Sequence, residues 1–529
     1  MKNIWCFLKR NKILLFLITL FFFYGFNNIL LLGPYGIHTW RQADCLSITD
    51  NYFTKGSSFW EPEIHNYISD EKTSGKTAGE FPILYYLISV LWKIFGKHEA
   101  IYRMVVLGLN ITGFFYLFKI LKNLLTNEFW AICTTLCFFS TPILLFYGSS
   151  FLTNSPAFSL VLIGWYHFYK FHKERKMYYL YFSLFFFALA GLLKITAFIS
   201  AIAILALLCI ELIRSFFKIK PQVFQSIFKS FLPFGLAILV LILWYKLYID
   251  YYTGLHQGKY TFNDLWPIWK MEPEKVSKAW NFFLDFSSFQ YLNPLMWIIF
   301  IFSLFVSLFG FKYVGKGFSI IVLAILVGTI IYILCWFNSL LYHDYYLINL
   351  IILPLISVIG MILFIKNKWN NWFISTKAKW VIGIVTTFSI CYGANNLRMR
   401  YSQEMKYSNA FVSLFNSKYE VGIWYYGAHN RSGDSVNGIE SYLKGIGINE
   451  NDLVICASDP SFCIELYLIN RKGWTGYNLN NNFNNINKLK NKGAKYIIVT
   501  NPKHLEDDQL KPFIKDKIGQ FKKASIFKL

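Results

Sequence analysis

Long uncharged apolar segments recur along most of this 529-residue chain and set the strongest limit on its fold. A helix needs about 20 mostly apolar residues to cross the hydrocarbon core of a bilayer. Only 15% of the residues are charged, whereas soluble domains carry about 25%. The sequence therefore excludes a soluble enzyme, a disordered protein and a secreted disulfide scaffold. It predicts a polytopic α-helical membrane protein with about eleven spans, near residues 11–32, 99–119, 129–147, 152–170, 177–193, 195–214, 229–249, 291–311, 317–338, 343–366 and 378–397.

The basic residues indicate which way the spans face, because Lys and Arg accumulate on the cytoplasmic side. They precede the first span and then fill alternate connections, at Lys119/Lys122, Lys170–Lys176, Arg214–Lys229, Lys312/Lys316 and Lys366–Lys379. This alternation holds only if the short apolar stretch 81–96 does not cross. We therefore predict a helix there that lies against the outer membrane surface, with the N-terminus inside and the C-terminus outside. The alternative is that 81–96 is an ordinary short span and another assigned span is wrong.

The net charge and the cysteine spacing indicate which binding partners to expect. The formal net charge of +23 fits basic loops that face an anionic leaflet and lipid phosphates, so we expect membrane lipids as partners and no nucleic acid. The nine cysteines show no CxxC or Cys/His metal spacing. Cys456 and Cys463 lie close together near the C-terminus, and the sequence leaves open whether they pair.

The segment after residue 397 is polar and rich in asparagine. Asp452–Ala457 and Ala494–Thr500 are predicted strands, and Ser461–Arg471 and Ile486–Gly493 are predicted helices. Strands and helices that alternate with short connections indicate a small parallel α/β domain.

Ionisable residues recur at the ends of the spans that are predicted to face outward. Arg41 and Asp44 are three residues apart, so on a helix they share one face. Taken singly, Arg103 could snorkel to the interface and Lys194 could cap a helix end. Their convergence at one membrane face is the stronger signal, because ionisable groups at membrane depth usually mark a functional pathway. The set comprises Arg41, Asp44, Glu80, Arg103, Lys194 and His343.

These residue types suit chemistry on a phosphate-linked lipid. An acid in a partly apolar cleft is a candidate general base for a hydroxyl acceptor. Guanidinium and ammonium groups would neutralise charge that develops on a phosphate leaving group. Nucleotide sugars are not expected outside the cytoplasmic membrane, so a glycosyl donor there must be carried on a lipid. Transfer from a polyprenyl-phosphate sugar meets this requirement.

Five short motifs carry a family resemblance. They are Trp40-Arg-Gln-Ala-Asp44, Glu80-Phe-Pro-Ile-Leu-Tyr-Tyr86, Phe95-Gly-Lys-His-Glu-Ala-Ile-Tyr-Arg103, Gly191-Leu-Leu-Lys194 and His343-Asp-Tyr-Tyr346. Together with the first span they resemble the GT-C superfamily of membrane glycosyltransferases, especially bacterial relatives of protein O-mannosyltransferases and lipid A aminoarabinose transferases. The resemblance implies a GT-C-like fold of about eleven transmembrane helices with outer juxtamembrane helices.

The resemblance also implies roles for single residues. Asp44 would be the catalytic base of an inverting single displacement, and Glu80 a second acid that positions the acceptor or a metal. Arg103 and Lys194 would bind the lipid-linked phosphate. The remaining substrate-binding residues would be Arg41, His343, Tyr345 and Tyr346.

Two departures from the family pattern limit this transfer of roles. Many relatives carry an acid at the position of Asn154, so any role for that position is in doubt. The mannosyltransferases have two adjacent acids where this chain has the single Asp44, so mannose as the sugar is not supported.

The resemblance implies an organisation and a location for the whole chain. Residues 1–400 would form the transmembrane catalytic module, with a first extracytoplasmic loop at 33–98, and residues 401–529 an extracytoplasmic domain that helps to recognise the acceptor. We expect a multi-pass protein of the bacterial cytoplasmic (inner) membrane. Its partners would be a polyprenyl-phosphate-linked sugar donor and a lipid, polysaccharide or protein acceptor. No cofactor is required, although Glu80, His65 and His343 could gather around a divalent metal.

Two other classes compete with an enzyme. A transporter or flippase of a lipid-linked saccharide would show charged or Gly/Pro-broken residues at mid-membrane, or two matching halves, and the sequence shows neither. An anchored scaffold needs far fewer spans, since one suffices. The sequence thus favours a glycosyltransferase and leaves its sugar and acceptor open.

Overall fold

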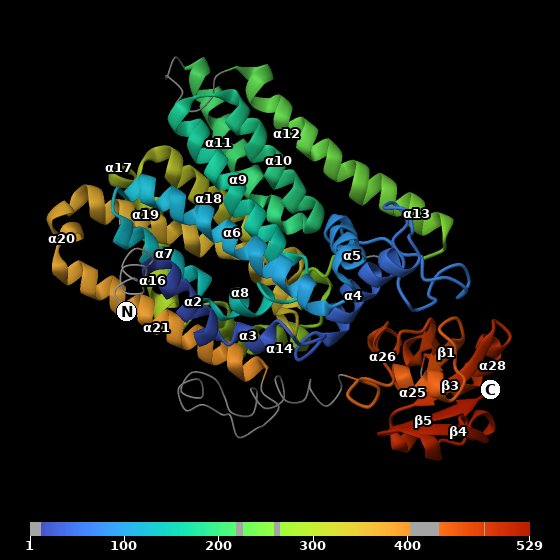
Figure 1. Cartoon of the computed structure of the whole chain (residues 1–529). Coiled ribbons are helices and arrows are strands. Elements are labelled where there is room, and N and C mark those ends of the chain that lie inside the picture. The colour runs from blue at the N-terminus through green and yellow to red at the C-terminus, as the bar shows by residue number, and fades with distance from the viewer. Residues whose placement is uncertain (1–11, 218–225, 259–264, 402–432, 481) are drawn as a thin grey trace. The chain divides into compact units, whose positions relative to one another are not determined.

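The computed structural model describes residues 12–217, 226–258, 265–401, 433–480 and 482–529. It divides into two compact units, each described by itself below. Figure 1 labels the helices and strands by the names used here. The helical unit comprises Met1–Leu32, Arg103–Leu243 and Leu265–Val421, and the mixed unit comprises Gly33–Tyr102, Trp244–Asp264 and Gly422–Leu529.

The helical unit is built from apolar helices with short connections, some continued or interrupted by 3₁₀ and π segments (η). In chain order these are α2 (Lys12–Tyr24), α3 (Phe26–Ile29), α6 (Glu99–Leu125), α7 (Glu128–Phe139), α8 (Pro142–Tyr147), α9 (Asn154–Glu174), α10 (Met177–Leu193), η1 (Ile195–Phe198), α11 (Ile199–Phe216), α12 (Ile227–Ile242), η3 (Ile268–Lys270), α14 (Pro273–Phe282), η4 (Phe283–Ser287), α15 (Ser288–Tyr291), α16 (Pro294–Phe309), α17 (Phe311–Val314), α18 (Lys316–Cys335), η5 (Phe337–Leu340), η6 (Asp344–Ile351), α19 (Ile352–Lys368), α20 (Asn370–Ile374) and α21 (Thr376–Arg400).

Every predicted span contains at least one helix, and the chain is a multi-pass membrane protein. Among the described residues, five helices are long and apolar enough to cross a bilayer, or six if the pair Pro273–Tyr291 and Pro294–Phe309, bent by 94°, counts as one span. The predicted span 11–32 is interrupted at Gly25, whose φ is +80°. The predicted span 129–147 is interrupted at Thr141, which is extended because Pro142 follows it. The count of about eleven spans and the direction of each crossing stay predictions.

Small residues allow close contacts within the helical unit. Gly113 of α6 lies against Ser159 of α9, and a Cβ added there would come within 2.7 Å of the Ser159 Cα. Gly393 of α21 lies against the Ser140 carbonyl, where an added Cβ would come within 2.0 Å of the oxygen. Such contacts are typical of helix packing in membranes, where backbones approach closely at small side chains.

The mixed unit contains the predicted α/β domain. Its five-stranded sheet has the order β2-β1-β3-β5-β4. Strands β1 (Leu453–Cys456), β2 (Gly473–Thr475) and β3 (Ala494–Val499) are parallel, whereas β4 (Asp516–Phe521) and β5 (Ala524–Lys528) are antiparallel additions. The two predicted strands are confirmed as β1 and β3. The predicted helices correspond to α26 (Ile464–Leu468) and α28 (Ile486–Lys490), with α25 (Glu440–Gly445) and α27 (Gly476–Leu479) beside them.

The central strands β1 and β3 are buried on both faces of the sheet. Successive strand residues point to opposite faces, so Ile455 and Ile497 pack in one apolar cluster with Trp474. Val454 and Ile498 pack in the other. This two-sided burial explains why β1 and the second half of β3, Ile497–Val499, are continuous apolar runs in the sequence.

The loop after the first span belongs to the same unit. It contains α4 (Thr39–Thr54) and α5 (Ile83–Phe95), and a later segment adds η2 (Leu243–Tyr248) and α13 (Ile249–Leu255). Helix α5 forms where the surface helix is predicted at 81–96. It buries Tyr85 and Trp92 and exposes Leu87 and Ile94. Its position against a membrane stays a prediction, as do the domain boundaries.

Candidate functional site

The start of α4 is fixed by its own side chains. Gln42 donates to the carbonyl oxygens of Tyr35 (2.8 Å) and Ile37 (2.9 Å), and Thr39 donates to the Gly36 carbonyl (2.5 Å). His38 lies at φ 58° immediately before the helix. This turn directs the first two turns of α4, and with them the predicted site residues, into the interior of the mixed unit.

Arg41 lies between two predicted site acids. Its Nη2 is 2.5 Å from Oε2 of Glu80, and its Nη1 is 3.9 Å from Oδ2 of Asp44. All three side chains are buried. The structure thus brings Arg41, Asp44 and Glu80 together, as predicted, although the role of each residue stays a prediction. A cavity of about 10 Å³ beside Glu80 and Arg41 has room for about one water molecule.

The α/β domain reaches this cluster. Cys463, the residue before α26, donates from its Sγ to Oδ1 of Asp44 over 3.2 Å. Phe462 packs edge-on against Trp40, with ring centroids 5.0 Å apart. The pairing that the sequence left open for Cys456 and Cys463 is not present, because both are free thiols. Sequence reasoning missed the contact with Asp44, because 419 residues separate the two side chains.

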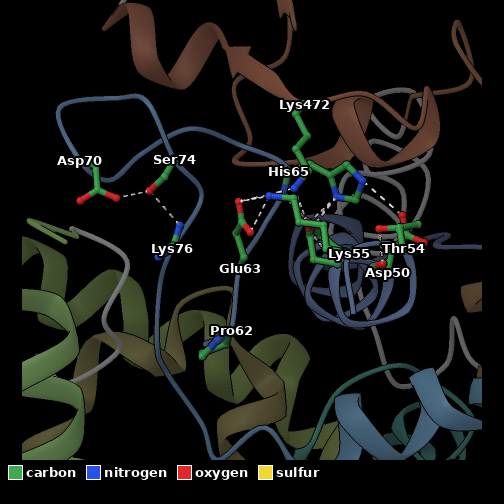
Figure 2. Close-up of polar contacts among 12 residues, drawn as sticks. Asp50, Thr54, Lys55, Pro62, Glu63, His65, Asp70, Ser74, Lys76 and Lys472 are labelled. Carbon is green, nitrogen blue, oxygen red and sulfur yellow. Dashed lines mark hydrogen bonds and ion pairs between the residues drawn. The ribbon is translucent and has the colours of Figure 1, made fainter. Parts of the chain in front are cut away.

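A second polar network extends along α4 (Figure 2). His65 places Nδ1 2.8 Å from the Ser47 hydroxyl and Nε2 3.3 Å from Oδ2 of Asp50. Lys97 lies 2.7 Å from Oδ1 of the same carboxylate. Burial lowers the pKa of His65 and outweighs the opposite effect of Asp50. Burial would raise the pKa of Asp50, but His65 and Lys97 bring it below its usual value.

The same network includes a carboxylate between two lysines. Glu63 lies 2.7 Å from the Lys55 Nζ and 3.5 Å from the Lys472 Nζ. Burial lowers the pKa of Lys472 to about 7, with Glu63 opposing and Lys55 reinforcing the change. Lys472 also donates to the Asn51 side chain of α4 over 2.5 Å, so this network ties the domain to the loop. No local pattern in the sequence indicates these pairs.

The predicted metal site has no support from these contacts. Among the described residues there is no group of three or more His, Cys, Asp or Glu side chains that could hold a metal ion. His65 bonds to Ser47 and pairs with Asp50, and Glu80 bonds to Arg41. A divalent metal near Glu80 therefore stays a prediction.

The helical unit brings together a second set of predicted residues. Lys194 is extended (φ −157°, ψ 112°) between α10 and η1. Its Nζ lies 4.5 Å from the ring centroid of Tyr346. The His343 Nδ1 lies 3.4 Å from the Tyr345 hydroxyl, and Asn154 donates to the Tyr345 carbonyl over 3.0 Å. The arrangement offers a cation from the connection between α10 and η1, and an imidazole and phenols from the start of η6, which suits an anionic sugar-phosphate.

Arg103 is held by backbone groups. It is completely buried and donates to the carbonyl oxygens of Leu32 (2.7 Å) and Ser149 (2.6 Å), while its guanidinium lies 4.2 Å from the Phe151 ring centroid. Phosphate binding by Arg103 stays a prediction, and these contacts show that it joins three segments of the helical unit.

Asp344 is a buried acid to which sequence reasoning gave no role. It pairs with Arg400 over 3.1 Å and accepts a hydrogen bond of 2.5 Å from Tyr147. The available signal was its position inside the His343–Tyr346 motif, where the flanking residues received the roles. The pair joins the start of η6 to the end of α21, so it fixes the segment that carries His343 and Tyr345.

One known protein family and two solved structures resemble this chain. The family model for dolichyl-phosphate-mannose-protein mannosyltransferase matches residues 78–245. The structure of ArnT from Cupriavidus metallidurans in the apo state resembles this chain with a TM-score of 0.59 at 9% identity, over 98% of each chain. The chain has the GT-C fold. ArnT from the same organism bound to undecaprenyl phosphate gives a TM-score of 0.56 at 9% identity, again over 98% of each chain. A search of curated proteins found no match.

The GT-C fold confirms the predicted architecture of membrane helices and a small C-terminal α/β domain. The matched family segment contains Glu80, Arg103 and Lys194 but not Asp44.

Proposed function

We propose that this protein is a glycosyltransferase that moves a sugar from a polyprenyl-phosphate donor to an acceptor hydroxyl. The buried cluster of Arg41, Asp44 and Glu80 carries this proposal, because it sets two acids around one guanidinium in a protein with the GT-C fold. The solved complex of ArnT with undecaprenyl phosphate supports a polyprenyl phosphate as the lipid carrier.

Asp44 acts as the general base in an inverting displacement. Its carboxylate takes the proton from the acceptor hydroxyl, whose oxygen attacks the anomeric carbon of the sugar. The bond between that carbon and the phosphate oxygen breaks, and polyprenyl phosphate leaves with the electron pair. Arg41 holds Asp44 and Glu80 at a fixed separation, so that Glu80 positions the acceptor through a preorganised site.

Lys194 binds the donor phosphate, together with His343, Tyr345 and Tyr346. An ammonium group beside aromatic rings in a buried segment stabilises the negative charge that grows on the leaving phosphate. Arg103 also binds the donor phosphate in this proposal, and its bonds to the Leu32 and Ser149 carbonyls hold its guanidinium in place.

The reaction takes place on the extracytoplasmic face of the bacterial inner membrane. This assignment rests on the distribution of Lys and Arg among the connections between spans, which places the N-terminus in the cytoplasm and residues 401–529 outside. A lipid carrier supplies the sugar there, and the acceptor is a lipid, a polysaccharide or a protein.

The test compares Asp44→Asn with Asp70→Asn in proteoliposomes. Asp70 lies in the same loop and pairs with His256 rather than with Arg41. With a radiolabelled polyprenyl-phosphate sugar, Asp44→Asn should lower product formation by about 10²- to 10⁴-fold, because it removes the general base. Asp70→Asn should keep wild-type activity. Equal activity of the two variants would refute the proposal, and movement of intact lipid-linked saccharide without product would identify a flippase instead.

A further inference from the structure

The C-terminal domain supplies a thiol that contacts the proposed catalytic base. Cys463 Sγ lies 3.2 Å from Oδ1 of Asp44, and the exposed fractions of the two residues are 0% and 1%. We propose that Cys463 is a positioning residue for Asp44, whose S–H group fixes the orientation of the carboxylate and stabilises its ionised form. This inference rests on the proposed function and assigns the C-terminal domain a part in the reaction itself.

The domain holds the cysteine from one side. The Asp459 carboxylate accepts hydrogen bonds from the backbone N–H groups of Ser461 (2.8 Å) and Glu465 (2.9 Å). The Ser461 hydroxyl accepts from the N–H of Ile464 (2.9 Å), and its carbonyl accepts from the Thr475 hydroxyl (2.6 Å). These bonds fix the backbone on both sides of Cys463. A thiol is a weak donor, so its effect on a carboxylate depends on such a fixed backbone.

The first loop holds the same segment from the other side. Asn66 donates to the Phe462 carbonyl over 2.7 Å and to the Thr475 hydroxyl over 3.1 Å. Trp40, four residues before Asp44, packs edge-on against the Phe462 ring. The first loop and the C-terminal domain therefore both contact Phe462, the residue next to Cys463. The thiol and the carboxylate are thus held together with little conformational freedom.

The electrostatic surroundings keep Cys463 in its donor form. Burial raises the pKa of its thiol well above the usual value, and the charge of Asp44 raises it further. Arg41 and Cys45 on α4 and Cys463 on the C-terminal domain interact directly with the Asp44 carboxylate. Glu80 interacts with Arg41 and Cys45, and Asp459 interacts with Cys463. Arg41 compensates the carboxylate charge on the Oδ2 side, and Cys463 donates on the Oδ1 side.

The first experiment compares pH–rate profiles. Cys463→Ala removes the donor, so the Asp44 carboxylate gains a proton more readily. We expect the acid limb of kcat to move upward by about 0.5–1 pH unit, with kcat about threefold to tenfold lower and the KM for the donor unchanged. Cys463→Ser restores a donor and should return the limb to the wild-type position or below. The matched control is Cys456→Ala, which removes another buried thiol of the same domain and should leave the limb in place.

The second experiment separates this inference from the proposed function. The S–H stretching band of Cys463, identified by its loss in Cys463→Ala, should shift in the infrared spectrum of Asp44→Asn. An unchanged band, or an acid limb that stays in place in Cys463→Ala while Asp44→Asn is inactive, would overturn the inference alone. Full activity of Asp44→Asn would overturn the proposed function and this inference with it.

Discussion

Replacing Glu80 by Gln should destabilise the mixed unit, because the buried guanidinium of Arg41 loses its carboxylate partner. The exposed fractions of the Arg41 and Glu80 side chains are 9% and 6%. Removing one partner of a buried ion pair typically costs about 3–5 kcal/mol. Asp44 still lies 3.9 Å from Arg41 and offsets part of this loss, so we expect about 3 kcal/mol for Glu80→Gln.

A double-mutant cycle tests the origin of that loss. Arg41→Met removes the guanidinium and keeps most of the apolar stem, so Arg41→Met/Glu80→Gln leaves neither charge of the pair. The free energy of unfolding, measured by titrating a denaturing detergent into mixed micelles, should fall in the double variant by about 2–3 kcal/mol less than the sum of the single changes. Additivity within about 0.5 kcal/mol would refute the reasoning.

Two further predictions concern a titration and a helix contact. Because burial holds the pKa of Lys472 at about 7, and an unfolded lysine titrates near about 10.4, the unfolded state binds more protons between these values and stability rises with pH there. Lys472→Met should remove about 1–2 kcal/mol of the rise in unfolding free energy between about pH 7 and 9, and parallel wild-type and variant curves would contradict this. Gly393→Ala should cost about 1–3 kcal/mol, because its Cβ would meet the Ser140 carbonyl at 2.0 Å. Gly383→Ala, in the same helix with one atom at 4.0 Å, should be as stable as wild type in the same assay.

The sequence predicted the helices well, because a segment that crosses lipid must be apolar and must satisfy its own backbone hydrogen bonds. It also predicted β1 and β3, whose apolar runs reflect burial on both faces. Strand β4 was missed because Asp516–Phe521 has only two large apolar residues and, at the edge of the sheet, buries none of its residues fully.

For the site, the sequence predicted the residue types but not all the pairings. The spacing of Arg41 and Asp44 predicted that they share a helix face, yet the shorter contact of Arg41 is with Glu80, 39 residues away. His65 was considered as a metal ligand, whereas the fold pairs it with Asp50 and Ser47. Cys463 carried no signal, because its contact with Asp44 exists only after the domain and the loop have come together.

Strand β2, at the edge of the sheet, pairs with a segment that is synthesised about 400 residues earlier, so the order of synthesis limits when this edge can be covered. Tyr67 donates its N–H to the Gly473 carbonyl over 2.7 Å, and the N–H of Gly473 donates to the His65 carbonyl over 3.2 Å. Residues made early thus cover the strand edge of a sheet made last. A nascent chain that stops before residue 473 leaves the segment around His65 without its partner, and a fragment that begins after residue 433 exposes an unpaired edge that invites aggregation. Only a chain that contains both segments pairs the residues around His65 with the edge of β2.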